Sequence, residues 1–586
     1  MTVKTLIKAL AILVLAIAVT IVGLLAFGYM QMPKNAASTP GGVLFGPGAA
    51  DPAPSPTPVP TPVLSPTPYF YTPAPIADTR PARFEFIREL ETDGEISQSY
   101  TSPGDIFFGP ADAFSFVEGV TTFRGNNYRD SAAYGTADIT LKTLTHVWSA
   151  ATGSMKRGIS SSDPDARWSG SGWVGQPLIV RWPEATKRIM NLYDSAKNKP
   201  GLVEVILATM DGSVYFLDLE TGEPTRDKLR IGMPFKGAGS IDPRGYPLLY
   251  LGPGDGYADK SIDARAMVYS LIDFERLYEF GLREDPFALR KWHAYDSSPL
   301  INAASDTLFY PGENGILYRV KLNTHYDEAA GSITVNPSQL VKYRYNAARV
   351  DTNGDYWLGF EASAAGWREY LYLADNAGFM QCINVNTMDI VWVQDLLDDT
   401  NATPVLEEDE DAHTAYLYVG ASLDYLAGDG KGDASFFKLD AVTGEILWQD
   451  TRAVRYNASA AGGVQATAAL GKHSIDDLVI VSYSRTPNSG SGLIVALDKA
   501  TGMERWTYPL ERYSWPSPVD VYDKFGNAYI VTCDSGGSIT LLDGRTGALL
   551  DTIQFENNNM EASPAVFDNM LVIGTRSNQI LGIRLN

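Results

Sequence analysis

A short turn motif recurs along this chain, and it restricts the possible folds more than any other feature of the sequence. Its full form, Ala-x-Asp-x-x-Thr-Gly-x-x-x-Trp, stands at residues 496–506, and partial copies contain Asp218, Asn384, Asp440 and Asp543. Asp and Thr can hydrogen-bond the backbone of a tight turn, and Gly supplies a positive φ. The Trp of the next strand can pack across to a neighbouring unit. The chain of 586 residues is therefore expected to be one repeat architecture rather than several unrelated domains.

A second recurring motif, a polar residue followed by proline, precedes many of the apolar segments. It occurs at Gln176-Pro177, Ser298-Pro299, Thr403-Pro404, Ser517-Pro518 and Ser563-Pro564. Proline is tolerated as the first residue of a strand, where no ladder donor is needed. Only 20% of the residues are charged, and Gly 53 and Tyr 31 suit short strands joined by tight turns. We therefore expect an all-β chain.

The turn motif and the polar–proline motif together resemble the repeats of the pyrroloquinoline-quinone (PQQ) propeller family. The resemblance extends from about Phe123 to Asn586 and includes the lead-in Phe-Arg-Gly-Asn-Asn-Tyr-Arg at residues 123–129. It implies an eight-bladed, quinoprotein-like β-propeller over residues 144–586, preceded by a lead-in segment over 83–143. Inner strands are expected to start near residues 176, 240, 298, 361, 403, 464, 517 and 563.

The last unit lacks an outer strand, because the chain ends at Asn586 where the next hairpin should begin. The segment around Trp148 has a Trp-bearing strand pattern but no unit of its own. We therefore expect this segment to complete the last blade and close the ring, which buries two strand edges.

The N-terminal part predicts a membrane anchor and a stalk. Residues 9–29 contain no charged side chain, and a helix of this length crosses a hydrocarbon core of about 30 Å. Lys4 and Lys8 precede it, which places residues 1–8 in the cytoplasm, a transmembrane signal anchor over 9–30, and the rest outside. A cleaved signal peptide is the alternative. Residues 31–82 are rich in Pro, Thr and Ser and predict a disordered or extended stalk.

Charge and cysteine content exclude some partners. The chain has 47 basic and 69 acidic residues, and the net charge of -22 disfavours binding to nucleic acid. Its two cysteines, Cys382 and Cys533, fall in different units, so no disulfide framework is expected.

The resemblance implies possible quinone and calcium chemistry, because enzymes of this family oxidise alcohols or sugars with both. Those enzymes place two adjacent cysteines over the quinone, whereas here Ile383 follows Cys382 and Asp534 follows Cys533. We therefore expect no catalytic residues and neither cofactor. The loop with Asp351, Asn353 and Asp355 spaces oxygen ligands as a calcium loop does, but Tyr356 stands where Gly is required, so it is a weak calcium candidate or simply a turn.

Residues just ahead of the inner strands are the candidate ligand site. In a propeller they converge on one mouth of the central channel, where ligands commonly bind. They are Trp173, Lys236, Asp296, Glu361, Asn401, Asn457, Trp515 and Glu561. Indole, amide and charged groups of this kind can hold a peptide or a glycan, and the alternative is that they cap strands and pack blades together.

The function expected from these features is a membrane-anchored, extracytoplasmic protein-interaction scaffold whose partners are other cell-envelope or cell-surface proteins. A receptor for cell-wall glycan or peptide and a quinone-dependent dehydrogenase are the alternatives. The sequence leaves the ligand, the partner and the oligomeric state open.

Overall fold

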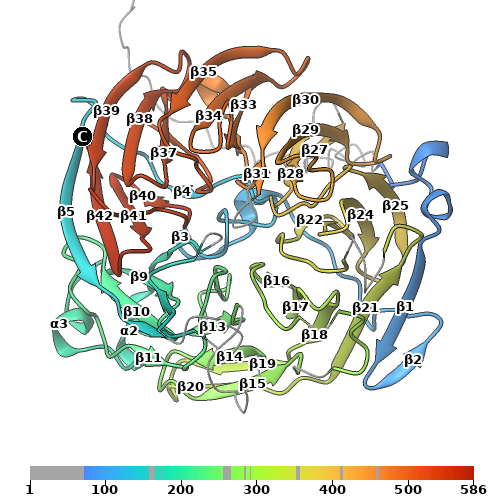
Figure 1. The fold of residues 1–586 in the computed structure, drawn as a ribbon. Helices are drawn as coiled ribbons and strands as arrows, with labels where there is room; N and C mark the ends of the chain where they lie inside the picture. The colour runs from blue at the N-terminus through green and yellow to red at the C-terminus, as the bar shows by residue number, and fades with distance from the viewer. Residues whose placement is uncertain are drawn as a thin grey trace, which may run out of the picture. The chain divides into compact units, whose positions relative to one another are not determined.

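The computed structural model describes residues 71–586 apart from 158–164, 173–174, 255–264, 283–284, 291, 351–356, 410–412 and 457–460. Tyr69–Asn586 forms one compact unit. Eight sheets, each built on four antiparallel strands, are arranged radially around a centre, as Figure 1 shows, and four of the sheets carry additional strands. The expected all-β eight-bladed propeller is confirmed.

Each blade runs from an inner strand at the channel to an outer strand at the rim. Blade 1 contains β8 (Leu178–Arg181), β9 (Val203–Ala208), β10 (Ser213–Asp218) and β11 (Leu229–Arg230). Blade 2 contains β12 (Ser240–Ile241), β13 (Leu248–Leu251), β14 (Ala266–Ser270) and β15 (Arg276–Phe280). Blade 3 contains β16 (Leu300–Asn302), β17 (Thr307–Pro311), β18 (Leu317–Lys321) and β21 (Gln339–Asn346). Blade 4 contains β22 (Ala365–Trp367), β23 (Tyr370–Ala374), β24 (Phe379–Asn384) and β25 (Ile390–Asp395).

The second half of the ring repeats this order. Blade 5 contains β26 (Val405–Asp409), β27 (Thr414–Gly420), β29 (Lys431–Asp440) and β30 (Ile446–Arg455). Blade 6 contains β32 (Ala469–Leu470), β33 (Leu478–Ser484), β34 (Gly492–Asp498) and β35 (Glu504–Leu510), joined by β31 (Gly462–Gly463) and β28 (Ser422–Leu423). Blade 7 contains β36 (Val519–Tyr522), β37 (Ala528–Cys533), β38 (Ser538–Asp543) and β39 (Leu549–Gln554). Blade 8 contains β40 (Ala565–Phe567), β41 (Met570–Gly574), β42 (Gln579–Leu585) and β5 (Leu144–Ala151).

Shorter elements decorate the blades. The helical turns are η1 (Ala77–Thr79), η2 (Pro81–Phe84), η3 (Ala111–Ala113), α2 (Glu184–Ile189), α3 (Asp194–Lys197) and η4 (His473–Ile475). The additional strands are β1 (Ile87–Thr92), β2 (Glu95–Ser97), β3 (Gly119–Val120), β4 (Ala133–Tyr134), β6 (Ser154–Lys156), β7 (Arg167–Ser169), β19 (Thr324–Asp327) and β20 (Ser332–Val335). No helix in the described part of the chain is long and apolar enough to cross a membrane, and the anchor expected over 9–30 lies outside that part.

The ring closes through the N-terminal strand β5. It pairs antiparallel with β42, and Trp148 lies opposite Gly582. The expected pairing of the Trp148 segment with the C-terminus is therefore confirmed, and both edges of blade 8 are paired, since β40 also pairs with β4.

Four of the five turn motifs receive a tryptophan from the outer strand of the preceding blade. The indole of Trp506 in blade 6 lies against Gly547 in the turn of blade 7, and its Nε1 donates a hydrogen bond to the carbonyl of Gly544 at 3.2 Å. The same contact recurs for Trp148 on Gly222, Trp392 on Gly444 and Trp448 on Gly502. The glycine thus serves both the turn, with φ near +70°, and the close approach of the ring.

The polar residues ahead of the inner strands form a chain of hydrogen bonds around the axis. The hydroxyls of Ser363, Thr403, Thr467, Ser517 and Ser563 each accept a hydrogen bond from the backbone N–H of the preceding member of the series, which begins at Ser298, at 2.8 to 3.1 Å. Ser and Thr recur just ahead of the inner strands because each hydroxyl satisfies a buried backbone donor of the neighbouring blade.

The lead-in ties distant blades together. Arg124 donates to the carbonyls of Pro518 and Ala468, and Arg129 donates to the carbonyl of Ala364. Both arginines are fully buried, so the segment crosses the ring centre, where Figure 1 draws it. Upstream, β1 pairs with β21 as a fifth strand of blade 3. Residues 71–82, assigned above to the stalk, include η1 and contact blade 5, where the N–H of Ala74 donates to the carbonyl of Val442 at 2.9 Å.

Candidate functional site

Four of the eight candidate mouth residues surround one cavity on the axis. Asp296, Glu361, Asn401 and Trp515 line it together with Phe123 of the lead-in, and the remaining lining residues are Ser363, Thr403, Gln465, Thr467, Ser517 and Ser563. Lys236 lies beside this cavity, because its Nζ is 2.7 Å from Oδ2 of Asp296. Trp173 and Asn457 lie outside the described residues.

The eighth candidate, Glu561, is not among the residues that line the cavity. It contacts two neighbouring side chains instead. Its carboxylate accepts a hydrogen bond from Nδ2 of Asn559 at 2.8 Å and lies 3.3 Å from Nη1 of Arg576. Its geometry is thus that of an internal ion pair.

The axial cavity is narrow. Its free volume is about 10 Å³, room for about one water molecule. Phe123 limits its depth, because the lead-in crosses the channel at this level. The site therefore has polar walls but little space for a ligand inside the ring.

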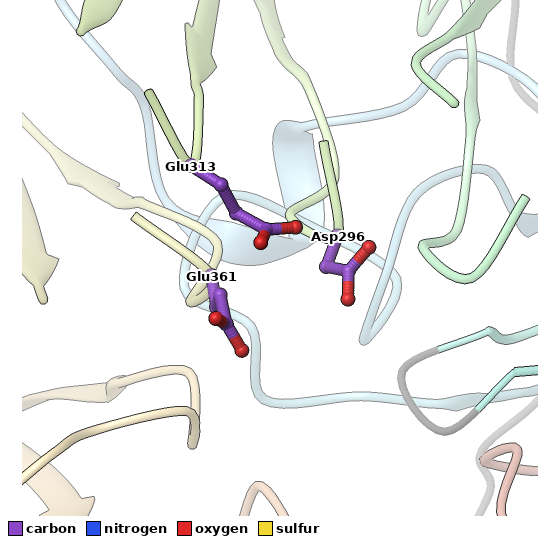
Figure 2. Close-up of side chains that lie close together, drawn as sticks. All are labelled: Asp296, Glu313 and Glu361. Atoms are coloured by element: carbon purple, nitrogen blue, oxygen red, sulfur yellow. The ribbon is translucent and has the colours of Figure 1, made fainter. Parts of the chain in front are cut away.

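Three carboxylates gather at the edge of this cavity. Asp296 precedes β16, Glu313 lies in the turn between β17 and β18, and Glu361 precedes β22. One ligand oxygen from each lies within 4.8 Å of the other two. Figure 2 shows the three side chains arriving from separate segments, with the Glu313 carboxylate directed toward Asp296. Asp296 and Glu313 are only 2% and 1% exposed.

Sequence reasoning missed Glu313. It stands in Gly-Glu-Asn-Gly at 312–315, which has the composition of an ordinary hairpin turn. Only the radial arrangement of blades 3 and 4 brings this turn to the segments that precede the inner strands, so no local signal marks it.

The three carboxylates lie close together in a buried setting, which disfavours their charged forms. Burial, with the charge of Asp296, raises the pKa of Glu313 well above its usual value. Burial and Asp296 likewise raise the pKa of Glu361. Lys236 and Arg290 oppose these shifts but do not cancel them.

An amide network continues from the carboxylates along the wall. Nδ2 of Asn376 donates to Asp399 at 2.8 Å, and Nδ2 of Asn401 donates to Asp399 at 2.9 Å and to Gln465 at 3.1 Å. Burial and the nearby charge of Glu361 raise the pKa of Asp399 well above its usual value. Asn401 is therefore hydrogen-bonded both to its own segment and to the segment that precedes blade 6.

A wider polar groove lies between the turns of blades 6, 7 and 8. Its volume is about 780 Å³, and its lining includes Arg512, Tyr513 and the run Asn557–Asn559. The rings of Tyr513 and Trp515 are 5.3 Å apart, so this groove adjoins the axial cavity through one aromatic pair.

A second large hollow lies at the other end of the inner strands. Its volume is about 770 Å³, and it is lined by lead-in residues such as Tyr128 and by Glu407, Lys472 and Lys499. Most of these charges are paired, as for Lys499 with Glu407 at 2.7 Å and Lys472 with Asp130 at 2.9 Å. A smaller apolar pocket beside it includes Phe107 and Phe116, and Phe116 is 72% exposed.

The two cysteines are not among the residues that line the axial cavity. Cys382 and Cys533 are both buried and unbonded, in β24 and β37. Burial raises the pKa of both thiols, which disfavours thiolate chemistry. Asp351, Asn353 and Asp355 lie outside the described residues.

The closed ring of eight blades defines the chain as a β-propeller, and its turn motif is similar to that of PQQ-type repeats. In agreement, residues 349–530 match the model of a family described as outer membrane protein assembly factor BamB. That match covers blades 4 to 6 and part of blade 7. No curated protein matches the chain.

Two solved structures that the chain is similar to are BamB and an alcohol dehydrogenase. BamB from Moraxella catarrhalis is 15% identical, with 69% of this chain and 98% of that chain covered and a TM-score of 0.44. Quinohemoprotein alcohol dehydrogenase ADHIIG from Pseudomonas putida HK5 is 12% identical, with 80% of both chains covered and a TM-score of 0.51. At 12% identity, the likeness to the dehydrogenase shows the fold alone.

Proposed function

We propose that this chain is a non-enzymatic protein-interaction scaffold of the cell envelope. The observation that carries the proposal is the match of residues 349–530 to the outer membrane assembly factor family. A propeller suits such a role, because its rigid ring holds long loops at fixed positions on two faces.

The narrow channel supports the non-enzymatic part of the proposal. PQQ has three fused rings, and the free volume of about 10 Å³ among Asp296, Glu361, Asn401 and Trp515 is far too small for it. The two thiols are buried in separate blades, away from each other in sequence and sheet. We infer that the described mouth does not fit the quinone.

The anchor belongs to the same proposal. We infer that residues 9–30 hold the chain in the membrane with residues 1–8 in the cytoplasm, and that the tract up to about residue 70 carries the propeller away from the bilayer. The partners would then be other envelope or cell-surface proteins.

The face that carries the lead-in is the best place for a partner. It holds the hollow of about 770 Å³ and the exposed ring of Phe116, and aromatic side chains beside a polar rim are typical of interaction sites. The test is photocrosslinking in the native membrane with p-benzoylphenylalanine in place of Phe116. A discrete adduct with an envelope protein is expected.

The control replaces Leu549, which is 53% exposed in β39 on the outer rim, by the same photocrosslinker. No such adduct is expected there. The scaffold proposal fails if the Phe116 position gives only unlinked protein or the same random pattern as the rim position.

A receptor for cell-wall glycan or peptide is the second candidate, and the groove with Tyr513 and Asn557–Asn559 favours it. Amide groups next to an aromatic ring can hydrogen-bond and stack on a sugar. Sedimentation with purified cell wall tests this function. Loss of sedimentation in Tyr513→Ala, with Phe116→Ala unaffected, would support a receptor instead of a scaffold.

A further inference from the structure

A small apolar pocket lies on the face that carries the lead-in, and its volume is about 180 Å³. The opposite wall consists of residues 301–304, at the end of β16 and in the turn that follows it. The lead-in supplies four phenylalanines to the lining, which are Phe107, Phe108, Phe114 and Phe116. An apolar cavity of about 150 Å³ holds a molecule of the size of benzene, so this pocket has room for one aromatic side chain.

Two of the phenylalanines at the pocket are exposed, yet their backbone is held in place. Phe107 is 48% and Phe116 is 72% exposed. The N–H of Phe116 donates to the carbonyl of Pro243 at 2.7 Å, and the carbonyl of Phe107 accepts a hydrogen bond from Nδ2 of Asn302 at 2.8 Å. A ligand that binds between these rings therefore has little backbone freedom to remove, which favours its affinity.

The polar groups in the pocket wall already have partners. The guanidinium of Arg244 lies 2.6 Å from the carboxylate of Asp242 and 2.7 Å from that of Asp306. Oδ1 of Asn302 accepts a hydrogen bond from the N–H of Ser305 at 2.9 Å. An apolar group can therefore enter the pocket without leaving these polar groups unpaired.

The charge of the segment around the pocket is negative. Residues 103–118 contain Asp105, Asp112 and Glu118 but neither Lys nor Arg. Asp105 and Asp112 are exposed, and Asp112 directly precedes Ala113, which lines the pocket. Acidic residues beside an apolar pocket favour a partner with basic residues and disfavour an anionic lipid surface.

We propose that this pocket binds one aromatic side chain of a partner protein, which the partner presents between basic residues on an exposed segment. The inference rests on the proposed scaffold function and names the chemistry of its partner. Aromatic side chains that fill a pocket supply much of the binding energy of protein interfaces, and charges at the rim add specificity.

The test is saturation-transfer NMR with the full-length chain in phosphatidylcholine nanodiscs, with empty nanodiscs as the blank. Three five-residue peptides are compared. They carry a central phenylalanine between two lysines, a central alanine between two lysines, and a central phenylalanine between two glutamates. The first should bind through its ring, the second should not bind, and the third should bind about two- to fivefold more weakly than the first. Equal binding of the first two would overturn the proposal.

The decisive variant is Ala304→Phe, which fills the pocket from an exposed position of its wall. It should abolish binding of the first peptide without a change in melting temperature. Phe107→Ala with Phe116→Ala should also abolish it. Phe525→Ala is the matched control, because Phe525 is 79% exposed in the turn between β36 and β37 and does not line this pocket. If Ala304→Phe binds the peptide as the parent does, the proposal is wrong.

The role of the acidic residues has its own variant. Asp105→Asn with Asp112→Asn should bring the affinity of the first peptide down to that of the third. An unchanged preference for lysine would contradict the role given to these acids. If short-chain phosphatidylglycerol displaces the first peptide, the pocket is a lipid site and the proposal is wrong.

Photocrosslinking at position 116 tests the scaffold function separately. A discrete adduct together with negative peptide results keeps the scaffold function and rejects this partner chemistry. Peptide binding without any adduct supports the preference of the pocket and rejects the scaffold function.

Discussion

The indole of Trp506 packs directly on Gly547, so position 547 has no room for a side chain. A Cβ at Gly547 would lie 2.4 Å from Cε3 of Trp506, and the backbone there has a φ of +70°. Gly547→Ala should therefore cost roughly 1–2 kcal/mol for the left-handed backbone and about 1–3 kcal/mol more for the clash. Urea denaturation measures the total decrease in the free energy of unfolding.

Gly232 provides the matched control, since its φ is +83° but no atom lies within 4 Å of the position that a Cβ would occupy there. Gly232→Ala should show the backbone cost alone. Equal losses for the two variants would mean that the indole does not constrain Gly547. The double variant Gly547→Ala with Trp506→Ala should lose less than the sum of the single changes.

Asp375 links stability to pH. It is fully buried and accepts hydrogen bonds from Tyr345, Gln381 and the N–H of Phe379. Burial raises its pKa from 3.8 to about 6. Because the folded state binds this proton more tightly than the unfolded state, the stability contribution is present below about pH 4 and is lost as the pH rises through 6.

The expected loss from Asp375 is about 2.4 kcal/mol between pH 4 and pH 7. Urea denaturation of Asp375→Asn across this range, compared with the parent, should show a stability difference that changes by this amount. A difference that stays constant with pH would contradict the raised pKa.

At the scale of elements, β5 is the strand that closes the ring by pairing with β42. Thr145 lies opposite Arg584 in the ladder with β42, and both residues are exposed. Residues in such a ladder position are close enough for a disulfide. Thr145→Cys with Arg584→Cys should therefore crosslink on oxidation and stabilise the fold by about 2–4 kcal/mol.

The stabilisation by this crosslink should vanish on reduction, and Thr145→Cys alone should show none of it. The native thiols are buried and should not interfere. A folded double variant that never forms the bond under oxidising conditions would show that the register of β5 on β42 is different.

At the scale of the whole molecule, the lead-in makes the ring one cooperative unit. Arg124 and Arg129 connect blades 4, 6 and 7 across the axis. Repeat arrays whose units contact only their neighbours can unfold in parts. This ring should instead show coincident transitions by circular dichroism and tryptophan fluorescence.

The variant Arg124→Met with Arg129→Met should lower the melting temperature and separate the two transitions. Removing the guanidinium groups leaves the carbonyls of Ala364, Ala468 and Pro518 without these donors. Two separate transitions already in the unaltered protein would contradict the role given to the lead-in.

The sequence by itself determined the repeat, the blade count and the closing strand. These follow from chemistry within about ten residues, such as the Asp-x-x-Thr-Gly turn that leads to Trp506, and from a missing strand at Asn586. It also indicated which residues precede the inner strands, because that position is fixed within each repeat.

Only the tertiary structure decided what surrounds the axis. Glu313 reaches Asp296 and Glu361 from a different kind of loop, and Phe123 fills the channel from the lead-in. These distances depend on how eight blades are placed around one axis, a relation between segments up to hundreds of residues apart. Local patterns encode hairpins, whereas the radial packing of the hairpins sets the cavity, its charge and its depth.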